Sequence, residues 1–344
     1  MTVSDTFLRD ALQTVIAGDD LDCDTARRVM DAFMDGSATH TQMGGFLTAL
    51  RAKGESVDEL TGMVESMREH CVRVDVDAGA VDTCGTGGDG LGTFNISTAA
   101  ALVAAGAGCT VAKHGNRAAS SRCGSADVLE ALGVVIDLPP ERVTRCIDEA
   151  GIGFLYAPSY HPAMKHVGPV RRELGVRTVF NVLGPLANPA GVRHQAIGVP
   201  DSSLAPLMAR VLQRLGHRHA LVFSGAEGID ELGVNGVARV HEATPSAVHE
   251  FHVDPQDFGF TPAALSEVRG GDAAENARIV SDVLDGVPGA ARDVVLLNAA
   301  AVLVAADAAA DLAEGVASAA RSIDSGEARQ RLRKLVDAST RAVA

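Results

Sequence analysis

The chain has 344 residues, of which 47% are hydrophobic, and its formal net charge is −14 at pH 7. This length and apolar content allow one large domain or two smaller ones with a sizeable core. The acidic balance argues against binding of nucleic acid or an anionic membrane through the overall field. The six cysteines lack C-x-x-C spacing. No stretch suits a membrane span or a signal-peptide core, so we expect reduced thiols and a cytoplasmic protein.

Helical periodicity dominates residues 1 to about 70. Apolar side chains recur about every 3.6 positions over residues 7–16 and 47–67. A helical unit this small cannot bury all of its apolar faces by itself. We therefore expect it to pack against a second copy of the chain, which predicts a homodimer through this unit.

From residue 81 onward, short apolar strands alternate with helices, the pattern of a mostly parallel sheet. The first strand ends in a glycine-rich turn, where Gly85, Gly87 and Gly88 can point successive amides at one anion. An apolar helix over 99–105 follows, and its N-terminal amides attract negative charge. The residues that can cap this helix or donate hydroxyl hydrogen bonds there are Thr93, Asn95, Ser97 and Thr98. A phosphate group is expected at this helix end.

A cationic turn follows the second short apolar segment, residues 109–112. It contains Lys113, His114, Asn116 and Arg117. A strand, a helix and a second strand would bring this turn and the glycine-rich turn to one sheet edge, where open α/β sheets bind ligands. Both turns are therefore expected to face the same anionic ligand.

The glycine spacing also fits the dinucleotide pattern G-x-G-x-x-G, through Gly85, Gly87 and Gly90. That fingerprint requires an acid about 20 residues further on, to hold a ribose hydroxyl. Here the second strand ends in Lys113 and Arg117 instead, which disfavours NAD and leaves an NADP-dependent oxidoreductase as an alternative. A Walker A loop is excluded, because no Gly-Lys-Ser/Thr follows the glycines.

Several motifs stand in a fixed order along the chain. They are GTGGD at 85–89, NIST at 95–98, KHGNR at 113–117, GSAD at 124–127, HPAMKHVGPVRRELGVRTVFNVLGPLANP at 161–189, GIDEL at 228–232 and RDVVLLNAAA at 292–301. In this order they resemble the anthranilate phosphoribosyltransferases of tryptophan biosynthesis. The resemblance covers nearly the whole chain.

The resemblance implies an α/β fold with a small discontinuous helical domain and a larger α/β domain, whose mostly parallel central sheet is flanked by helices. The helical domain would comprise residues 1–72, with 160–182 returning to it. The α/β domain would comprise 76–158 and 190–344 and carry the donor and magnesium sites. The active site would lie in the cleft between the two domains.

The activity implied is transfer of the phosphoribosyl group of phosphoribosyl pyrophosphate to the amine of anthranilate. The products would be N-(5-phosphoribosyl)anthranilate and pyrophosphate, in the second step of tryptophan biosynthesis from chorismate. The leaving pyrophosphate gathers negative charge, so preorganised amides, a lysine and magnesium should matter most.

The resemblance also implies which residues line the substrate sites. They are Gly85, Gly88, Asp89, Thr93, Asn95, Ile96, Ser97, Thr98, Lys113, His114, Gly115, Asn116, Arg117, Ala118, Ala119, Ser120, Ser121, Ser125 and Arg171. Catalytic roles would fall to Lys113, Asn116 and Arg171, the last by holding the carboxylate of anthranilate. A guanidinium can grip a carboxylate through two parallel hydrogen bonds.

The neighbour of Arg171 is not expected to share this role, because successive helical residues point about 100° apart. Arg172 should therefore face elsewhere. The apolar slot for the ring would be walled by Pro158, Tyr160, His161 and Met164, with Asn116 and His114 at its inner end.

An acid pair, Asp230 and Glu231, follows the apolar strand at 220–223. Magnesium prefers hard oxygen ligands and often takes one or two carboxylates together with substrate phosphates. An isolated acid pair is more often a solvated turn. The resemblance implies instead that Asp230 and Glu231 bind one Mg²⁺ ion, and that Glu231 and Ser97 hold a second.

Two further functional classes remain open. A pyrimidine nucleoside phosphorylase would share the helical and α/β architecture and also act at an anomeric carbon. A non-enzymatic nucleic-acid-binding paralogue would need a basic surface, which the net charge of −14 does not favour.

Overall fold

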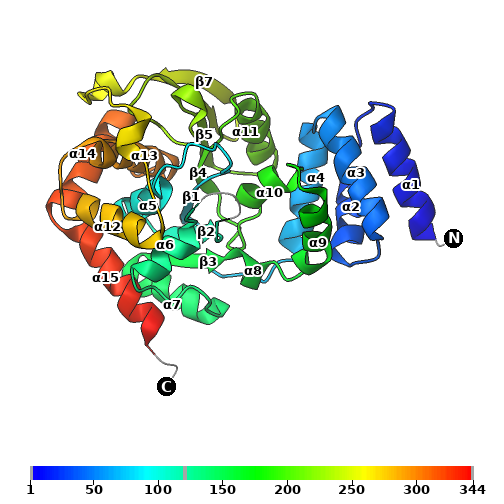
Figure 1. The fold of residues 1–344 in the computed structure, drawn as a ribbon, viewed down its shortest axis with the longest axis horizontal. Coiled ribbons are helices and arrows are strands. Elements are labelled where there is room, and N and C mark those ends of the chain that lie inside the picture. Colours follow the sequence, from blue (N-terminus) through cyan, green and yellow to red (C-terminus); the bar gives the residue numbers. More distant parts are fainter. Residues whose placement is uncertain (1–2, 119–121, 342–344) are drawn as a thin grey trace.

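The computed structural model describes residues 3–118 and 122–341 (Figure 1). The chain begins with four helices: α1 (Val3–Ile16), α2 (Cys23–Met34), α3 (His40–Lys53) and α4 (Val57–Glu69). The third and fourth begin at capping boxes, in which Thr39 and Ser56 each exchange hydrogen bonds with the residue three positions on. The predicted N-terminal helical unit is confirmed.

A seven-stranded sheet forms the centre of the larger part of the molecule. Its strands are β1 (Val81–Gly85), β2 (Val111–Gly115), β3 (Ile152–Tyr156), β4 (His194–Gly198), β5 (His219–Ser224), β6 (Ala238–Ala243) and β7 (Val248–Val253). Their order is β3-β2-β1-β4-β5-β6-β7. The first five in this order run parallel, and β6 and β7 form an antiparallel edge. The predicted α/β fold with a mostly parallel sheet is confirmed.

The strand order fixes where a ligand can bind. From β1 the chain proceeds outward to β2 and β3, and then returns to place β4 on the other side of β1. The crossovers therefore leave β1 in opposite directions. In open α/β sheets, the crevice at the carboxyl ends of the strands beside such a switch point binds ligands. The glycine-rich turn after β1 lies at this position.

Helices cover both faces of the sheet. Those that follow the first strands or form the C-terminal part are α5 (Ile96–Gly106), α6 (Ser125–Ala131), α7 (Pro140–Ala150), α12 (Ala273–Leu284), α13 (Ala290–Ala305), α14 (Leu312–Asp324) and α15 (Glu327–Thr340). One apolar core lies between β1, α5 and α13. A second core joins the N-terminal helices to α11 (Leu204–Arg214) and the opposite face of β4 and β5. Short 3₁₀ helices occupy Ala226–Gly228, Pro255–Phe258 and Leu265–Val268.

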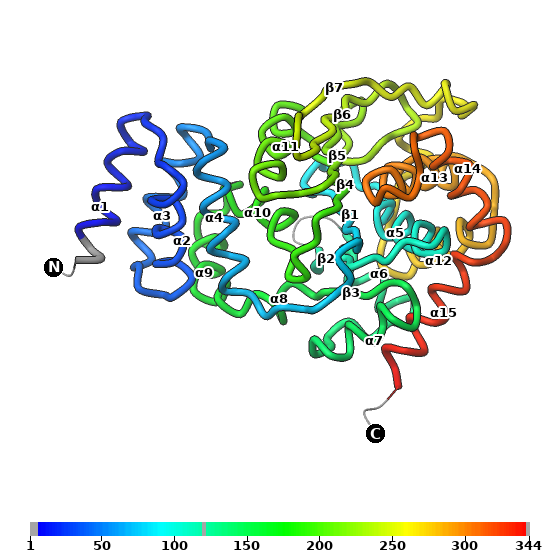
Figure 2. The backbone as a smooth tube through the Cα atoms, turned by 180° about the vertical axis from the view of Figure 1, so that it is seen from behind, coloured from blue at the N-terminus to red at the C-terminus, as the bar shows by residue number. Residues whose placement is uncertain are grey.

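Three consecutive helices lead from β3 to the N-terminal bundle and back: α8 (Ala157–Tyr160), α9 (Met164–Leu174) and α10 (Phe180–Leu186). The second packs on α2 and α3, and the third on α4. Figures 1 and 2 show α9 beside the blue N-terminal helices in both views. The exact domain boundaries given above stay a prediction. Of the described helices, none combines the length and apolar character needed to cross a membrane.

Candidate functional site

The turn that carries the acid pair lies directly on the ends of β1 and β4. A Cβ atom on Gly85 would collide with the carboxylate of Asp230, and one on Gly198 would collide with the Asp230 carbonyl oxygen. Both positions end their strands, and a side chain at either would push the acid turn away. These glycines therefore allow the predicted metal ligands to reach the glycine-rich turn.

The glycine-rich turn is folded around one of these carboxylates. Gly87 and Gly88 have φ values of 70° and 79°, a region that glycine adopts without strain. The Gly87 amide donates to Oδ2 of Asp230 at 2.7 Å. The turn thus directs the Gly87 amide at a carboxylate of the chain itself, and the phosphate group expected at this turn stays a prediction.

The second acid meets the start of α5. The Ser97 amide donates to Oε1 of Glu231 at 3.1 Å. The partial positive charge of a helix N-terminus stabilises a carboxylate at this position. Ser97 and Glu231, which the sequence assigns to one metal, are therefore neighbours.

The acids at this point are buried close together. Burial, and then the charge of nearby Asp89, raise the pKa of Asp230 to about 7. Burial and the charge of Asp230 raise the pKa of Glu231 well above its usual range. Oδ2 of Asp89 is buried without a hydrogen-bond partner. A cation placed among these carboxylates would lower the pKa values of Asp230 and Glu231 and would give Oδ2 of Asp89 a partner.

Magnesium fits this set of oxygen ligands. Within residues 3–118 and 122–341, no three His, Cys, Asp or Glu side chains are arranged so that they could hold a metal ion by themselves, and this holds for the present site too. A cation at Asp230 and Glu231 would thus complete its coordination with other groups, as magnesium does when it binds substrate phosphates.

Lys113 lies beneath the site in β2. Its side chain is fully buried, and Nζ donates to the Thr83 carbonyl oxygen of β1 at 2.6 Å. Its charge opposes the rise in the pKa of Glu231. In this structure, therefore, Lys113 partly balances the buried acids from below.

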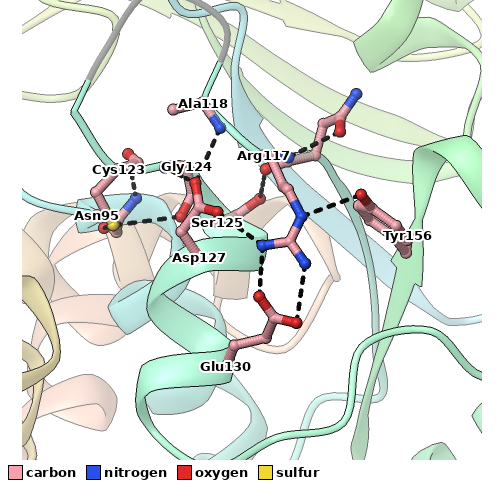
Figure 3. A network of polar contacts seen from close by, with 10 residues as sticks. Asn95, Arg117, Ala118, Cys123, Gly124, Ser125, Asp127, Glu130 and Tyr156 are labelled. Atoms are coloured by element: carbon pink, nitrogen blue, oxygen red, sulfur yellow. Dashed lines mark hydrogen bonds and ion pairs between the residues drawn. The ribbon is translucent and has the colours of Figure 1, made fainter. Parts of the chain in front are cut away.

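The cationic turn after β2 is tied to the helix that follows it (Figure 3). Arg117 forms an ion pair with Asp127, at 3.0 Å between Nη1 and Oδ1, and a two-pronged one with Glu130. Nε of Arg117 also donates to the Tyr156 hydroxyl at 3.2 Å. These partners raise the pKa of Arg117, whose charge thus serves mainly to hold the turn.

Asp127 organises the backbone of the same turn. Its Oδ2 accepts from the amides of Ala118 at 3.0 Å and Gly124 at 2.8 Å. The Asn116 carbonyl accepts from the Ser125 hydroxyl at 3.3 Å, which closes the turn. Three residues that the sequence analysis assigns to the substrate sites, Ala119, Ser120 and Ser121, lie outside the described residues.

Asn95 does not cap α5, although the sequence predicts a cap there. It occupies the N-cap position without a capping hydrogen bond. Its Nδ2 donates to the Cys123 carbonyl at 3.3 Å, and its Oδ1 accepts from Nδ2 of Asn276 at 2.8 Å. Thr93 does not cap the helix either; it lies two residues before the N-cap position, where its main chain forms an isolated antiparallel bridge with Arg269. Long-range partners have replaced the local ones.

The proposed acceptor arginine lies in the last turn of α9. Its guanidinium carbon lies 5.3 Å from the ring centroid of Phe180. Arg171 is half-buried, which lowers its pKa, and it forms no ion pair or side-chain hydrogen bond with any residue that the structure describes. Arg172 is exposed, as the helical geometry predicts. Arg171 therefore presents a cation beside an aromatic ring with no carboxylate partner.

The imidazole of His114 in β2 meets that of His161, which directly follows α8. The ring centroids of His114 and His161 are 5.1 Å apart, and Nε2 of each ring is buried without a partner. Burial lowers the pKa of His114 to about 3 and that of His161 to about 4. Both rings are therefore neutral near pH 7.

Tyr160, which the sequence analysis places in the wall of the anthranilate slot, lies in the α/β core. Its hydroxyl donates to the Leu138 carbonyl oxygen, so the hydroxyl is not available to a ligand in that slot.

Comparison with known proteins identifies the family. Residues 77–329 match the glycosyl transferase family, a/b domain, and residues 9–71 match the glycosyl transferase family, helical bundle domain. Over 97% of its length, the chain is 57% identical to the anthranilate phosphoribosyltransferase of Anaeromyxobacter sp. (strain K), of which 99% is covered. The chain belongs to the anthranilate phosphoribosyltransferase family.

Solved structures of anthranilate phosphoribosyltransferases have the same fold. That from Thermus thermophilus superposes with a TM-score of 0.92 at 45% identity, covering 96% of this chain and 100% of its own. That from Saccharomyces cerevisiae, in complex with PRPP and Mg, gives a TM-score of 0.88 at 29% identity, covering 97% and 98%. The predicted resemblance to this family is confirmed.

In this member of the family, two residues near the donor side were not predicted from the sequence. Asn276 of α12 holds Asn95, and Arg177, between α9 and α10, donates to the carbonyls of Gly87 and Gly88. The role of Asn276 could have been suspected from the sequence, because a polar residue at a buried helix position usually has a hydrogen-bond partner. No sequence pattern indicates the role of Arg177, because its partners are main-chain atoms about 90 positions away.

Proposed function

We propose that this protein transfers the phosphoribosyl group of phosphoribosyl pyrophosphate to the amine of anthranilate and releases pyrophosphate. The observation that carries the proposal is Arg171, a half-buried cation beside Phe180 with no acidic partner among the described residues. An aromatic carboxylate supplies both the anion and the ring that such a position can hold. The reaction would be the second step of tryptophan biosynthesis from chorismate.

The glycine-rich turn and the start of α5 would bind the donor. The amides of Gly87 and Ser97 donate to Asp230 and Glu231. Neighbouring main-chain amides of the turn and of the start of α5 would face the pyrophosphate, and preorganised donors of this kind lower the barrier to its departure. Lys113 would add positive charge from below the turn. Magnesium, held by Asp230, Glu231 and Ser97, would neutralise charge on the pyrophosphate; we propose two such ions.

Arg171 would orient the acceptor through its carboxylate. The amine is itself the nucleophile, and its proton becomes acidic only as the new bond forms, so no strong base is required. His114 and His161 are neutral at pH 7, and each offers a buried, unpartnered Nε2 atom near this side of the site. Their contribution would be to orient the ring and exclude water.

The remaining parts of the proposal concern the assembly. Residues 1–72 and 160–182 would form one domain, and 76–158 with 190–344 the other, with the substrates between them. Closure over the site would limit hydrolysis of the activated sugar. We further propose a cytoplasmic homodimer that associates through the helical domain.

The test is to mix the purified protein with phosphoribosyl pyrophosphate, Mg²⁺ and anthranilate, and to follow anthranilate fluorescence. We expect a loss of fluorescence that requires all three components. A folded protein that causes no loss at low or high salt would contradict the proposal. Phosphorolysis of a pyrimidine nucleoside by the same preparation would favour the phosphorylase alternative.

A further inference from the structure

Arg177 connects the segment that carries Arg171 to the glycine-rich turn. Its Nη1 donates to the carbonyl oxygens of Gly87 and Gly88, at 3.2 Å each. A Cβ atom on Gly88 would collide with this guanidinium. The close approach therefore depends on glycine at that position, in addition to the positive φ of the turn.

The contact orients the turn between two charged groups. The Gly87 amide donates to the carboxylate of Asp230, and the Gly87 carbonyl oxygen accepts from the guanidinium of Arg177. The amide edge of the turn thus faces the acid pair, and the carbonyl edge faces Arg177. Rotation of these peptide groups would break both interactions, so Arg177 holds the turn with its amides directed inward.

The positive charge of Arg177 is not neutralised by a salt bridge. Within the described part of the chain Arg177 forms no ion pair, and its side chain donates hydrogen bonds to these two carbonyls. The nearest charge effect is weaker: the charge of Arg177 contributes to lowering the pKa of Asp201 without a direct contact. Arg117, by contrast, is paired with Asp127 and Glu130. Arg177 therefore places a guanidinium without a direct acid partner beside the turn proposed to bind pyrophosphate.

The same short segment also carries the proposed acceptor residue. Gly175 ends α9 with a φ of 62°, and its amide donates to the Arg171 carbonyl at 3.2 Å. The Thr178 amide then donates to Oδ1 of Asn181 at the start of α10. These bonds tie both ends of the link that joins Arg171 to Arg177. A link this short, with a hydrogen bond at each end, would transmit a displacement of the glycine-rich turn to Arg171.

We propose that Arg177 is a positioning residue that couples the donor and acceptor sites. It holds the glycine-rich turn in the orientation that binds the donor, and it links the state of that turn to the position of Arg171. The inference rests on the proposed function. We expect this coupling to be favourable, so that each substrate raises the affinity for the other. Because coupling between two ligands is reciprocal, both affinities would rise by the same factor.

The experiment compares the wild-type protein with Arg177→Ala, Arg177→Lys and Arg172→Ala. The dissociation constant of phosphoribosyl pyrophosphate with Mg²⁺ is measured by calorimetry, alone and with saturating anthranilate. We expect Arg177→Ala to weaken donor binding about tenfold, the size of one lost hydrogen bond to a charged group. We also expect it to abolish the effect of anthranilate on that constant.

The controls separate positioning from a general loss of structure. Arg177→Lys keeps the charge without the planar fork and should lie between wild type and Arg177→Ala. Millimolar guanidinium should partly restore donor binding by Arg177→Ala. Exposed Arg172→Ala should match the wild type. If Arg177→Ala does not fold, Arg177→Lys is measured in its place. The proposal is overturned if that variant has the wild-type dissociation constant for phosphoribosyl pyrophosphate and anthranilate changes this constant as much as it does in the wild type.

The outcomes also separate this inference from the proposed function. Failure of the wild-type protein to bind phosphoribosyl pyrophosphate would overturn both. Wild-type binding and activity, together with unchanged constants and coupling in Arg177→Ala, would overturn the role of Arg177 alone. Equal weakening by Arg172→Ala would also overturn it, because the effect would then reflect positive charge in general.

Discussion

The donor and acceptor regions of the site balance their charges in opposite ways. At the donor side, Asp230 and Glu231 are buried, each accepts a main-chain amide, and their pKa values are raised. At the acceptor side, Arg171 has a ring beside it and no acid partner among the described residues, and the imidazoles of His114 and His161 are neutral. The donor region thus has buried carboxylates that a cation would stabilise in their charged form, and the acceptor region has one positive charge suited to an anion.

The difference shows how an acidic protein can bind two anionic substrates. Main-chain amides and a metal ion would serve the donor, whereas a single guanidinium would serve the acceptor. The two regions also come from different parts of the chain, the sheet edge and α9. Substitutions in one region should therefore leave binding in the other region largely intact, except where Arg177 links them.

The largest effect is expected for Asp230→Asn, which keeps the shape of the side chain and removes its charge. Loss of one metal ligand and of its electrostatic contribution should lower kcat/KM for phosphoribosyl pyrophosphate by roughly 10²–10³-fold. The measurement is the initial rate of anthranilate fluorescence loss over a range of donor and Mg²⁺ concentrations. Asp257→Asn, at an exposed position, is the matched control. Wild-type kinetics in Asp230→Asn would show that this carboxylate is not a ligand.

Arg171→Ala is expected to act on the acceptor. Loss of a charged hydrogen-bonding partner should raise KM for anthranilate about 10- to 100-fold, while KM for phosphoribosyl pyrophosphate changes little. Initial rates at varied anthranilate and saturating donor measure this. If KM for the donor rises and KM for anthranilate does not, the assignment of Arg171 is wrong.

A third prediction concerns pH and the paired imidazoles. His161 has a pKa of about 4 in the folded protein, against about 6.5 in an unfolded chain. Between these values the unfolded state binds more protons, so this group's contribution to stability is complete above pH 6.5 and is lost as pH falls toward 4. Its share of the loss between pH 8 and pH 5 is roughly 2 kcal/mol.

Urea unfolding of wild type and His161→Gln at pH 8, 6 and 5 measures this share. Glutamine is polar and does not titrate, so the variant should lose less stability than the wild type as pH falls. His252→Gln, at an exposed position in β7, is the control for removal of any one histidine. Parallel pH profiles for wild type and His161→Gln would contradict the account.

The smallest effect is expected for Arg172→Ala. This side chain is exposed and points away from Arg171 on α9. Exposed substitutions of this kind usually change little, so both KM values should stay within about twofold of the wild type. Initial-rate kinetics with each substrate varied in turn provide the measurement. A tenfold rise in KM for anthranilate would mean that both arginines face the acceptor.

The sequence predicts the features that depend on short-range patterns. Strand and helix alternation gives the parallel sheet, the glycines after β1 give the turn, and the amphipathic N-terminal segments give the helical unit. Their causes lie within a few neighbouring residues, which a sequence displays directly.

Features that depend on distant partners were not predicted or were predicted wrongly. The side chain of Asn95 suits a helix cap, yet Cys123 and Asn276 compete for it from 28 and 181 positions away. Arg117 stands in the sequence as a free cation, and only the fold brings Glu130 and Tyr156 to it. Main-chain carbonyls as partners of Arg177 leave no trace in the sequence.

The most direct test of the separate donor and acceptor regions is calorimetric titration of phosphoribosyl pyrophosphate with Mg²⁺, in the absence of anthranilate, into Asp230→Asn and Arg171→Ala. The account predicts strongly weakened binding by Asp230→Asn and near wild-type binding by Arg171→Ala. Equal loss of donor binding in the two variants would contradict it.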